Sequence, residues 1–409
     1  MQTTHVNPAT ESSTALPLKG IMVLDLTRFL PGALCTMLLR QLGARVVKVE
    51  DPRTGDPIRA VPPLVGSQEG ALSVLLNAGK ESIALDLKTK EGRLAFERLA
   101  AKSDVVIDNF RPGVMHRLSL DHARLQAINE RIVTCSLTGF GDGALRDKVA
   151  HDINYIALCG LLGQCGARGG PPAIPGAQVA DAGAALFGVV GILAAIVRRD
   201  ATGAGGRVDV AMFDAALCFM AVHIAHLLAG DPVAPCGGGR VTGADPAYNV
   251  YRAADGKYLA LGAIEHRFWK AFCEGIGRDD LIDARRSGRD PESVRNEVQR
   301  CLAGRTAAEW CHHFQGKDVC LDQVLEVDEV PSLLESIGST MLVQSIDPRL
   351  GTVRHLSSPV RVSGATVNPG GAIASLGQHT DLVLGEIGYT AQQIAALRSV
   401  QAAHSQQEL

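Results

Sequence analysis

The sequence predicts an α/β protein: a large domain with an open, mostly parallel, Rossmann-like sheet, followed by a smaller α+β domain. Two observations carry this prediction. Up to Gly141, apolar segments of strand length alternate with segments of helix length, a pattern typical of a parallel sheet wrapped by helices. Residues 230–246 are then rich in Gly and Pro, and the pattern after them opens with an expected hairpin and continues as helices.

The first strand–helix–strand unit is expected at residues 20–26, 31–43 and 45–50. Such a unit needs a parallel crossover, and ligands of parallel sheets sit beyond the carboxyl ends of the strands. A lone Pro31–Gly32 occupies the first turn in place of a G-x-G-x-x-G motif, so the sequence does not support NAD or FAD binding. The alternation continues with a strand at 82–87, a helix at 89–102, and strands at 104–110 and 131–141.

The same patterns predict the domain organisation. We expect a hairpin turning at Asp255–Gly256 to open the second domain, and the last segment to rejoin the first. The expected parts are a flexible N-terminal extension (1–17), a large domain (18–229), a linker (230–247), a small domain (248–335) and a returning C-terminal segment (336–409).

Composition excludes several classes of protein. A formal net charge of −3 with scattered basic residues offers no footprint for nucleic acid. The 10 cysteines contain no C-x-x-C pair and no Cys/His ligand spacing, which argues against a zinc site or a disulfide framework and favours a reducing, cytoplasmic location. The first residues are polar and do not resemble a signal peptide. The apolar run Ala182–Val197 is shorter than a bilayer span, so we expect a buried helix and no membrane association.

His151 in A-H-D-I-N-Y and Asp181 in Q-V-A-D-A-G are the leading catalytic candidates. A neutral base and a carboxyl on opposite sides of a carbon acid can remove and return a proton on either face. Asp152 is a candidate to orient His151, and Tyr155 to cover it. The alternatives stay open: Asp152 and Asp181 are both placed where a residue caps a helix.

Asp181 is expected at the start of a long apolar helix, where the helix dipole favours an anion. The N–H groups of that helix terminus would then be the donors for an enolate oxygen. Glu265 follows a strand of the second domain and could hold the His151 ring, or it could be a solvated surface carboxylate.

Several basic residues follow predicted strands and would gather on one rim of the sheet. Such a group suits a ligand with several phosphates, although exposed Lys and Arg are also common without any ligand. The candidates are Arg53, Arg59, Lys80, Arg111 and Arg117.

From Leu18 to Tyr389 the chain resembles the class III CoA-transferase (CaiB/BaiF) superfamily. The resemblance implies CoA thioester chemistry on an interlocked homodimer, with the active site between the large domain of one subunit and the small domain of its mate. We therefore expect residues 18–229 to bind CoA, with Arg53, Lys80, Arg111, Arg117 and Tyr155 as contacts. The matching segments are Leu18–Gly32, Leu42–Glu50, Lys80–Lys88, Phe110–Leu118, Ser136–Gly141, Gly206–Ala215 and Leu376–Thr380.

Within that superfamily, A-H-D-I-N-Y and G-A-I-E resemble the α-methylacyl-CoA racemases. The resemblance implies that His151 and Asp181 form the acid/base pair, and that Asp152 and Glu265 assist them. It implies a racemase of 2-methyl-branched acyl-CoA that needs no cofactor other than the CoA of its substrate. One alternative is a CoA-transferase with Asp181 as nucleophile; another is a catalytically silent CoA-binding protein. This chain has A-G-A-A after Asp181, where racemases usually have several glycines.

Overall fold

A computed structural model describes residues 16–66, 68–363, 365, 370–400 and 402–404. The chain divides into two compact units, which are described separately below. Unit 1 comprises residues up to 155, 178–216 and 336 onward; unit 2 comprises 156–177 and 217–335. Residues 156–177 and 217–229, which the sequence pattern assigns to the large domain, group with unit 2, because both segments make their contacts there. The extension expected at residues 1–17 falls almost wholly outside the described residues.

Unit 1 contains a seven-stranded sheet in the order β14-β5-β2-β1-β6-β7-β8. Every pairing is parallel except that of β14 with β5. Taken in chain order, the six parallel strands have the Rossmann order 3-2-1-4-5-6, so the direction of winding reverses between β1 and β6. The open, mostly parallel α/β sheet predicted from the sequence is confirmed. The strands are β1 (Met22–Asp25), β2 (Arg45–Glu50), β5 (Glu81–Leu85), β6 (Val105–Asp108), β7 (Val133–Thr138), β8 (Gly206–Ala211) and β14 (Ala403–His404).

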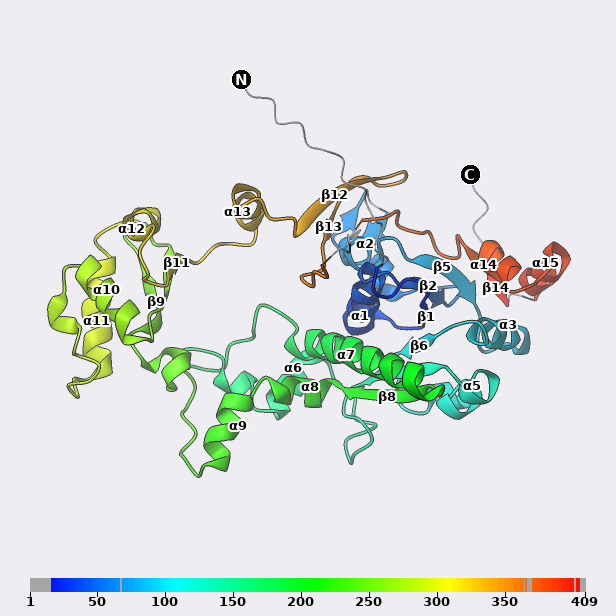
Figure 1. Cartoon of the computed structure of the whole chain (residues 1–409), viewed down its shortest axis with the longest axis horizontal. Coiled ribbons are helices and arrows are strands. Elements are labelled where there is room, and N and C mark those ends of the chain that lie inside the picture. Colours follow the sequence, from blue (N-terminus) through cyan, green and yellow to red (C-terminus); the bar gives the residue numbers. More distant parts are fainter. Residues whose placement is uncertain (1–15, 67, 364, 366–369, 401, 405–409) are drawn as a thin grey trace, which may run out of the picture. The chain divides into compact units, whose positions relative to one another are not determined.

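Helices α1 (Phe29–Gln41) and α7 (Val179–Thr202) lie side by side on one face of this sheet (Figure 1). Gly188 allows the close approach: a Cβ there would lie 3.1 Å from both Cys35 Sγ on α1 and Leu137 Cδ2 on β7. α7 is longer than the apolar run suggested, and its length and composition would allow it to cross a membrane, as those of many core helices do. It is only partly buried, with Val190 and Val197 exposed.

The opposite face packs against α3 (Lys90–Ala100), α5 (His122–Ile128), α14 (Thr380–Glu386) and α15 (Ala391–Ser399) in one apolar cluster. The C-terminal segment joins this cluster and adds β14 to the sheet. The remaining elements of unit 1 include α2 (Ala71–Asn77), α4 (Val114–Arg117), β3 (Leu64–Val65), β4 (Glu69–Gly70), β12 (Leu342–Asp347), β13 (Gly351–Leu356) and the 3₁₀ turn Pro57–Ala60.

Unit 2 is built around the antiparallel strands β9 (Tyr248–Arg252), β10 (Tyr258–Gly262) and β11 (Leu321–Gln323). The expected hairpin is present, with Gly256 at φ 82° in its turn. Trp269, Phe272 and Phe314 fill the core. The helices are α9 (Ala221–Leu228), α10 (His266–Gly275), α11 (Pro291–Leu302), α12 (Ala307–Phe314) and α13 (Val330–Ser336), with short turns at Leu162–Gln164, Arg240–Ala244 and Asp279–Leu281. Two helices, α6 (Asp152–Leu158) and α8 (Met212–Cys218), run across the boundary between the units.

Candidate active site

The loop after β7 leads directly into α6, which carries the sequence-predicted catalytic residues. The Tyr155 ring packs edge-on against Phe140 at 5.1 Å, and its hydroxyl donates to the Ala150 carbonyl at 3.3 Å. Gly139 makes room for this ring, since a Cβ there would lie 2.7 Å from Tyr155 Oη. Tyr155 is only 5% exposed, so it anchors α6 to the end of β7. Its roles in covering His151 and contacting CoA stay predictions.

Asp152 caps α7, a helix that begins 27 positions further along the chain. Its Oδ1 accepts the backbone N–H groups of Ala180 at 2.7 Å and Asp181 at 3.0 Å. Both local capping interpretations are therefore wrong. Asp152 lies inside α6 and does not cap it, and Asp181 is the third residue of α7, whose N-cap is Gln178. One carboxylate thus ties the first turn of α6 to the first turn of α7.

His151 immediately precedes α6 and is exposed. Its backbone is fixed, because its N–H donates to Asn154 Oδ1 at 3.0 Å and its carbonyl accepts the Asn154 N–H at 2.8 Å. Within the described parts of the chain, no hydrogen bond reaches the imidazole ring. Asp152 Oδ1 is engaged with α7, and among the described residues no hydrogen bond joins Asp152 to the ring.

The Asp181 carboxyl is partly buried beside both of these residues. Burial first and the Asp152 carboxylate second raise its pKa, to about 6, although His151 opposes the shift. Residues 182–185 are Ala, Gly, Ala and Ala, so no bulky side chain follows Asp181 in the helix. A carboxyl with a pKa near neutrality can both release and accept a proton under ordinary conditions.

The expected enolate donors at the start of α7 are already engaged. The N–H groups of Ala180 and Asp181 donate to Asp152, and the N–H of Ala182 donates to the Gln178 carbonyl at 3.0 Å. The prediction that the start of α7 supplies the oxyanion donors is therefore wrong for these three N–H groups. The Asp152 side chain accepts two of them, and the helix itself accepts the third.

Lys80 was predicted as a phosphate contact, and the structure contradicts this. Its side chain is 1% exposed and donates to Thr36 Oγ1 at 2.7 Å and Asn77 Oδ1 at 2.9 Å, with Asp25 Oδ2 at 3.3 Å. Burial lowers its pKa to about 8, although Asp25 opposes this. An ammonium with these partners is not free to bind a ligand.

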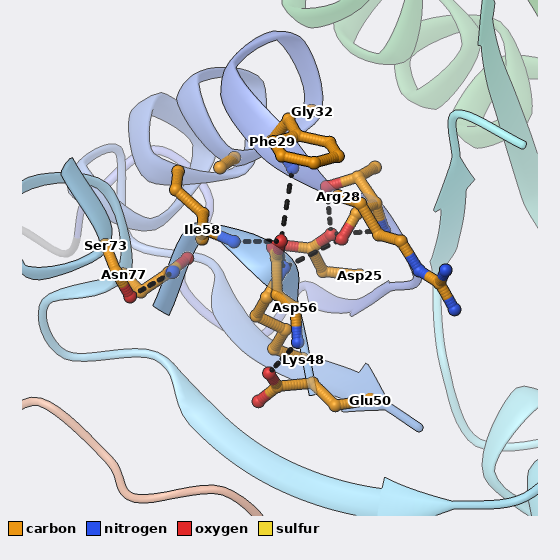
Figure 2. A network of polar contacts seen from close by, with 12 residues as sticks. Asp25, Arg28, Phe29, Gly32, Lys48, Glu50, Asp56, Ile58, Ser73 and Asn77 are labelled. Carbon is orange, nitrogen blue, oxygen red and sulfur yellow. Dashed lines mark hydrogen bonds and ion pairs between the residues drawn. The ribbon is translucent and has the colours of Figure 1, made fainter. Parts of the chain in front are cut away.

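Lys48 occupies the same buried network, which Figure 2 shows from close by. Its Nζ lies 2.9 Å from Asp56 Oδ2, and Asp56 Oδ1 accepts the N–H groups of Phe29 and Ile58. Burial would lower the pKa of Lys48, but Asp25 and Asp56 raise it above its ordinary value. The network fixes the loops at the carboxyl ends of β1 and β2.

Two of the predicted arginines are also paired with carboxylates. Arg59 is a structural residue, since it bridges Glu50 at 2.8 Å and Glu69 at 3.0 Å. Arg53 is 58% exposed and lies 3.2 Å from both Asp51 and Asp86. A phosphate would have to compete with two acids at Arg53, which weakens the prediction for this residue.

Arg111 and Arg117 fit the phosphate prediction best. Both are exposed beyond the end of β6, and neither forms an ion pair with any residue that the structure describes. Arg28, which the sequence analysis missed, joins them: it follows β1, lies over the Phe110 ring at 5.5 Å, and shares hydrogen bonds with Asn109 through its backbone. Its position in R-F-L-P-G, just after the first strand, was the available signal. These arginines flank the β1–β6 reversal point, where open α/β sheets bind ligands.

A cavity of about 410 Å³ is lined by Arg111 and by residues of β6 and β7. It contains Asp108, a second carboxyl that the sequence analysis missed. Burial raises the pKa of Asp108 to about 6, while hydrogen bonds from the Ser136 hydroxyl and the Phe110 N–H oppose the shift. Across the described residues, no cluster of three or more His, Cys, Asp or Glu side chains could hold a metal ion.

Glu265 belongs to unit 2, whereas His151, Asp152 and Asp181 belong to unit 1. It precedes α10, makes no capping hydrogen bond there, and lines a cavity of about 790 Å³. The pairing of Glu265 with His151 stays a prediction.

Comparison with known proteins decides the family. The model of CoA-transferase family III matches residues 18–380. The chain belongs to this family. Among curated relatives, the human alpha-methylacyl-CoA racemase is 33% identical, over 94% of this chain and 97% of its own. The acetyl-CoA:oxalate CoA-transferase of Acetobacter aceti is also 33% identical, over 85% of this chain and 90% of its own.

Solved structures with the fold of this chain are also known. A CAIB/BAIF family protein from Brucella suis superposes with a TM-score of 0.78 at 27% identity, covering 91% of this chain and 100% of its own. Racemases and CoA-transferases occur among the relatives at similar identity, so similarity alone leaves the reaction open.

Proposed function

We propose that this family III protein is a racemase or epimerase of 2-methyl-branched acyl-CoA thioesters. One observation carries the proposal: Asp152 fixes the start of α7, so that His151 and Asp181 stand at the first turns of two linked helices. A transferase of this family needs only the nucleophilic carboxylate, whereas 1,1-proton transfer needs a second acid/base group. His151 supplies that group.

The proton transfers balance in both directions. Neutral His151 takes the α-proton, the thioester carbonyl accepts the electron pair as an enolate, and protonated Asp181 delivers a proton to the opposite face. In the reverse reaction Asp181 is the base and His151 the acid. The thioester makes the α-proton removable, and no group beyond the CoA of the substrate is required. The pKa of Asp181, near 6, suits both of its roles.

The proposal extends to the remaining predictions. Arg28, Arg111 and Arg117 are assigned to the phosphates of CoA, and Glu265 to the second nitrogen of the His151 ring. We also propose a cytoplasmic homodimer without membrane association. These assignments rest on the resemblance to racemases and on the unpaired state of the three exposed arginines within the described chain.

A CoA-transferase is the second candidate, favoured by relatives of equal identity. In that reaction the Asp181 carboxylate attacks the thioester carbonyl and expels the CoA thiolate, forming a mixed anhydride. The thiolate then attacks the Asp181 carbonyl, which releases the acyl carboxylate and leaves an enzyme thioester. An acceptor carboxylate would receive CoA through the reverse steps.

Incubation of (2R)- and (2S)-2-methylacyl-CoA in deuterated water separates the candidates. A racemase incorporates α-deuterium without an acceptor acid, and His151→Ala abolishes this, while His312→Ala, which changes an exposed histidine of α12 in unit 2, does not. Exchange of CoA to a free acid without deuterium uptake would refute the racemase assignment. CoA binding with neither reaction would instead indicate a silent binding protein.

A further inference from the structure

Cys165 and Cys236 lie close together in unit 2, although they come from its two separate chain segments, 156–177 and 217–335. The Cβ position of Gly166, the residue after Cys165, is 3.3 Å from Cys236 Sγ. A Cβ on Gly237, the residue after Cys236, would lie 2.6 Å from the backbone nitrogen of Arg168. Neighbouring Cα atoms are about 3.8 Å apart, so the Cys236 sulfur lies beside the backbone that carries Cys165.

Hydrogen bonds hold the two segments in this arrangement. Gln164 Nε2 donates to the Ala234 carbonyl at 3.2 Å, which joins the segments directly. The Cys165 carbonyl accepts the Ala173 N–H at 2.8 Å, which fixes the backbone of the first cysteine. A disulfide needs its two Cα atoms within about 7 Å of each other. Because the two backbones already touch, a bond between these cysteines requires no large movement of either segment.

Both thiols are also accessible. Cys165 and Cys236 are half-buried, and both are free thiols in this structure. Cys35 and Cys135 provide the contrast, since they are neighbours as well but are fully buried, and burial raises the pKa of each of these two thiols. The thiolate is the reactive form of cysteine, and oxidants act on exposed thiolates. Of these two pairs, Cys165 and Cys236 are therefore the one that an oxidant in solution can reach.

We infer that Cys165 and Cys236 are a redox modification site, at which a peroxide forms a reversible disulfide within one chain. The Cys236 thiolate attacks one oxygen of hydrogen peroxide, the O–O bond breaks, and water leaves, so that Cys236 becomes a sulfenic acid. Cys165 then attacks that sulfur, the S–S bond forms, the S–O bond breaks, and a second water leaves. Two thiols are oxidised while one peroxide is reduced to two waters.

The order of these two steps follows from the surroundings of Cys165. Burial, and then the neighbouring Cys236, raise the pKa of the Cys165 thiol. Less Cys165 is therefore present as thiolate, which favours Cys236 for the first attack. The disulfide would fasten the segment between α6 and α7 to the Gly- and Pro-rich residues 230–246. Thiol–disulfide exchange with a cellular thiol would release it.

Treatment of the full-length protein with hydrogen peroxide tests the site, followed by mass spectrometry of a non-reduced tryptic digest. A peptide containing Cys165 should be linked to one containing Cys236, and dithiothreitol should separate them. The oxidised protein should unfold at a higher temperature than the reduced protein, because the crosslink restricts the unfolded chain. Cys165→Ser and Cys236→Ser should each lose the link and the gain in stability. In Cys165→Ser, dimedone should trap the sulfenic acid on Cys236.

Cys218→Ser is the matched control, since Cys218 is exposed and lies on the same tryptic peptide as Cys236. This variant should keep the link between Cys165 and Cys236. The inference is overturned if the wild type gives no linked peptide, if the link joins two chains on a non-reducing gel, or if Cys165→Ser and Cys218→Ser are oxidised alike. Because no turnover is measured, each result is independent of whether the protein racemises acyl-CoA.

Discussion

Asp152 accepts the backbone N–H of Asp181 at 3.0 Å, and so links two residues 29 positions apart. The contact has two physical effects. It caps the first turn of α7, and it places a negative charge near the Asp181 side chain, which contributes to the raised pKa of that carboxyl. One residue therefore controls both where Asp181 stands and how readily it ionises.

Substitutions of Asp152 should separate these two effects. Asp152→Asn keeps an oxygen that can accept the N–H groups but removes the charge, so the apparent pKa values of the bell-shaped pH–rate profile should shift downward. Asp152→Ala removes the cap as well and should lower the free energy of unfolding by about 1 kcal/mol. Urea unfolding and α-deuterium exchange against pH measure both. An unshifted profile for Asp152→Asn would contradict the electrostatic role.

Asp181 should make stability depend on pH. Its pKa is raised from 3.8 to about 6, so the folded protein holds this proton more tightly than the unfolded chain does. The stabilisation from that proton is complete below pH 3.8 and is lost as the pH rises through about 6. Asp181→Asn should therefore be more stable than the wild type at pH 8, by on the order of 1–2 kcal/mol, with little difference near pH 3.8. Equal differences at both pH values in urea unfolding would argue against a perturbed carboxyl.

Gly139→Ala should displace Tyr155. The added Cβ would lie 2.7 Å from Tyr155 Oη and 3.1 Å from Tyr155 Cε1. The Tyr155 ring also packs against Phe140, which limits how far it can move away. Overpacking of this kind costs about 1–3 kcal/mol and should move α6, so exchange activity should fall together with stability. Tyr155→Phe is the control, because it loses only a 3.3 Å hydrogen bond. If the double variant Gly139→Ala/Tyr155→Phe proves no more stable than Gly139→Ala, contact with the hydroxyl is not the main source of strain.

The sequence was sufficient to predict the sheet, because β1, β2, β6 and β7 are apolar segments separated by helices. It could not predict where the polar residues lie. Lys80 follows a Gly and precedes a strand, as a solvated rim lysine would, yet its acid partner Asp25 lies 55 positions earlier. The Asp152 cap likewise depends on two helix starts meeting in space. Residue types and spacing identified His151 and Asp181, whereas their supporting contacts required the fold.

Lys80→Met should destabilise the protein without affecting CoA binding. Without the Lys80 ammonium, the ion-pair partner that remains to the fully buried Asp25 carboxylate is Lys48, at 3.9 Å. Breaking a buried ion pair costs about 3–5 kcal/mol. Thermal unfolding should show this loss, whereas the exposed control Lys88→Met should not. A raised KM for acyl-CoA at unchanged stability would restore the phosphate role originally predicted for Lys80.

Arg111→Gln should have the opposite effect, raising the KM for acyl-CoA without loss of stability. The Arg111 side chain is exposed beyond β6 and has no ion-pair partner among the described residues, so the fold does not depend on its charge. A phosphate contact at such an exposed site should be worth roughly 1–1.5 kcal/mol, or a 5- to 10-fold rise in KM, and the double variant with Arg117→Gln should lose more. Added salt should weaken binding less in these variants than in the wild type, because fewer charges remain to be screened.

Arg131→Gln is the control for Arg111→Gln. It changes an exposed arginine that pairs with Asp200 at 3.2 Å, and it should leave KM unchanged. Equal KM values for Arg111→Gln and Arg131→Gln would show that the CoA phosphates do not bind at this edge of the sheet.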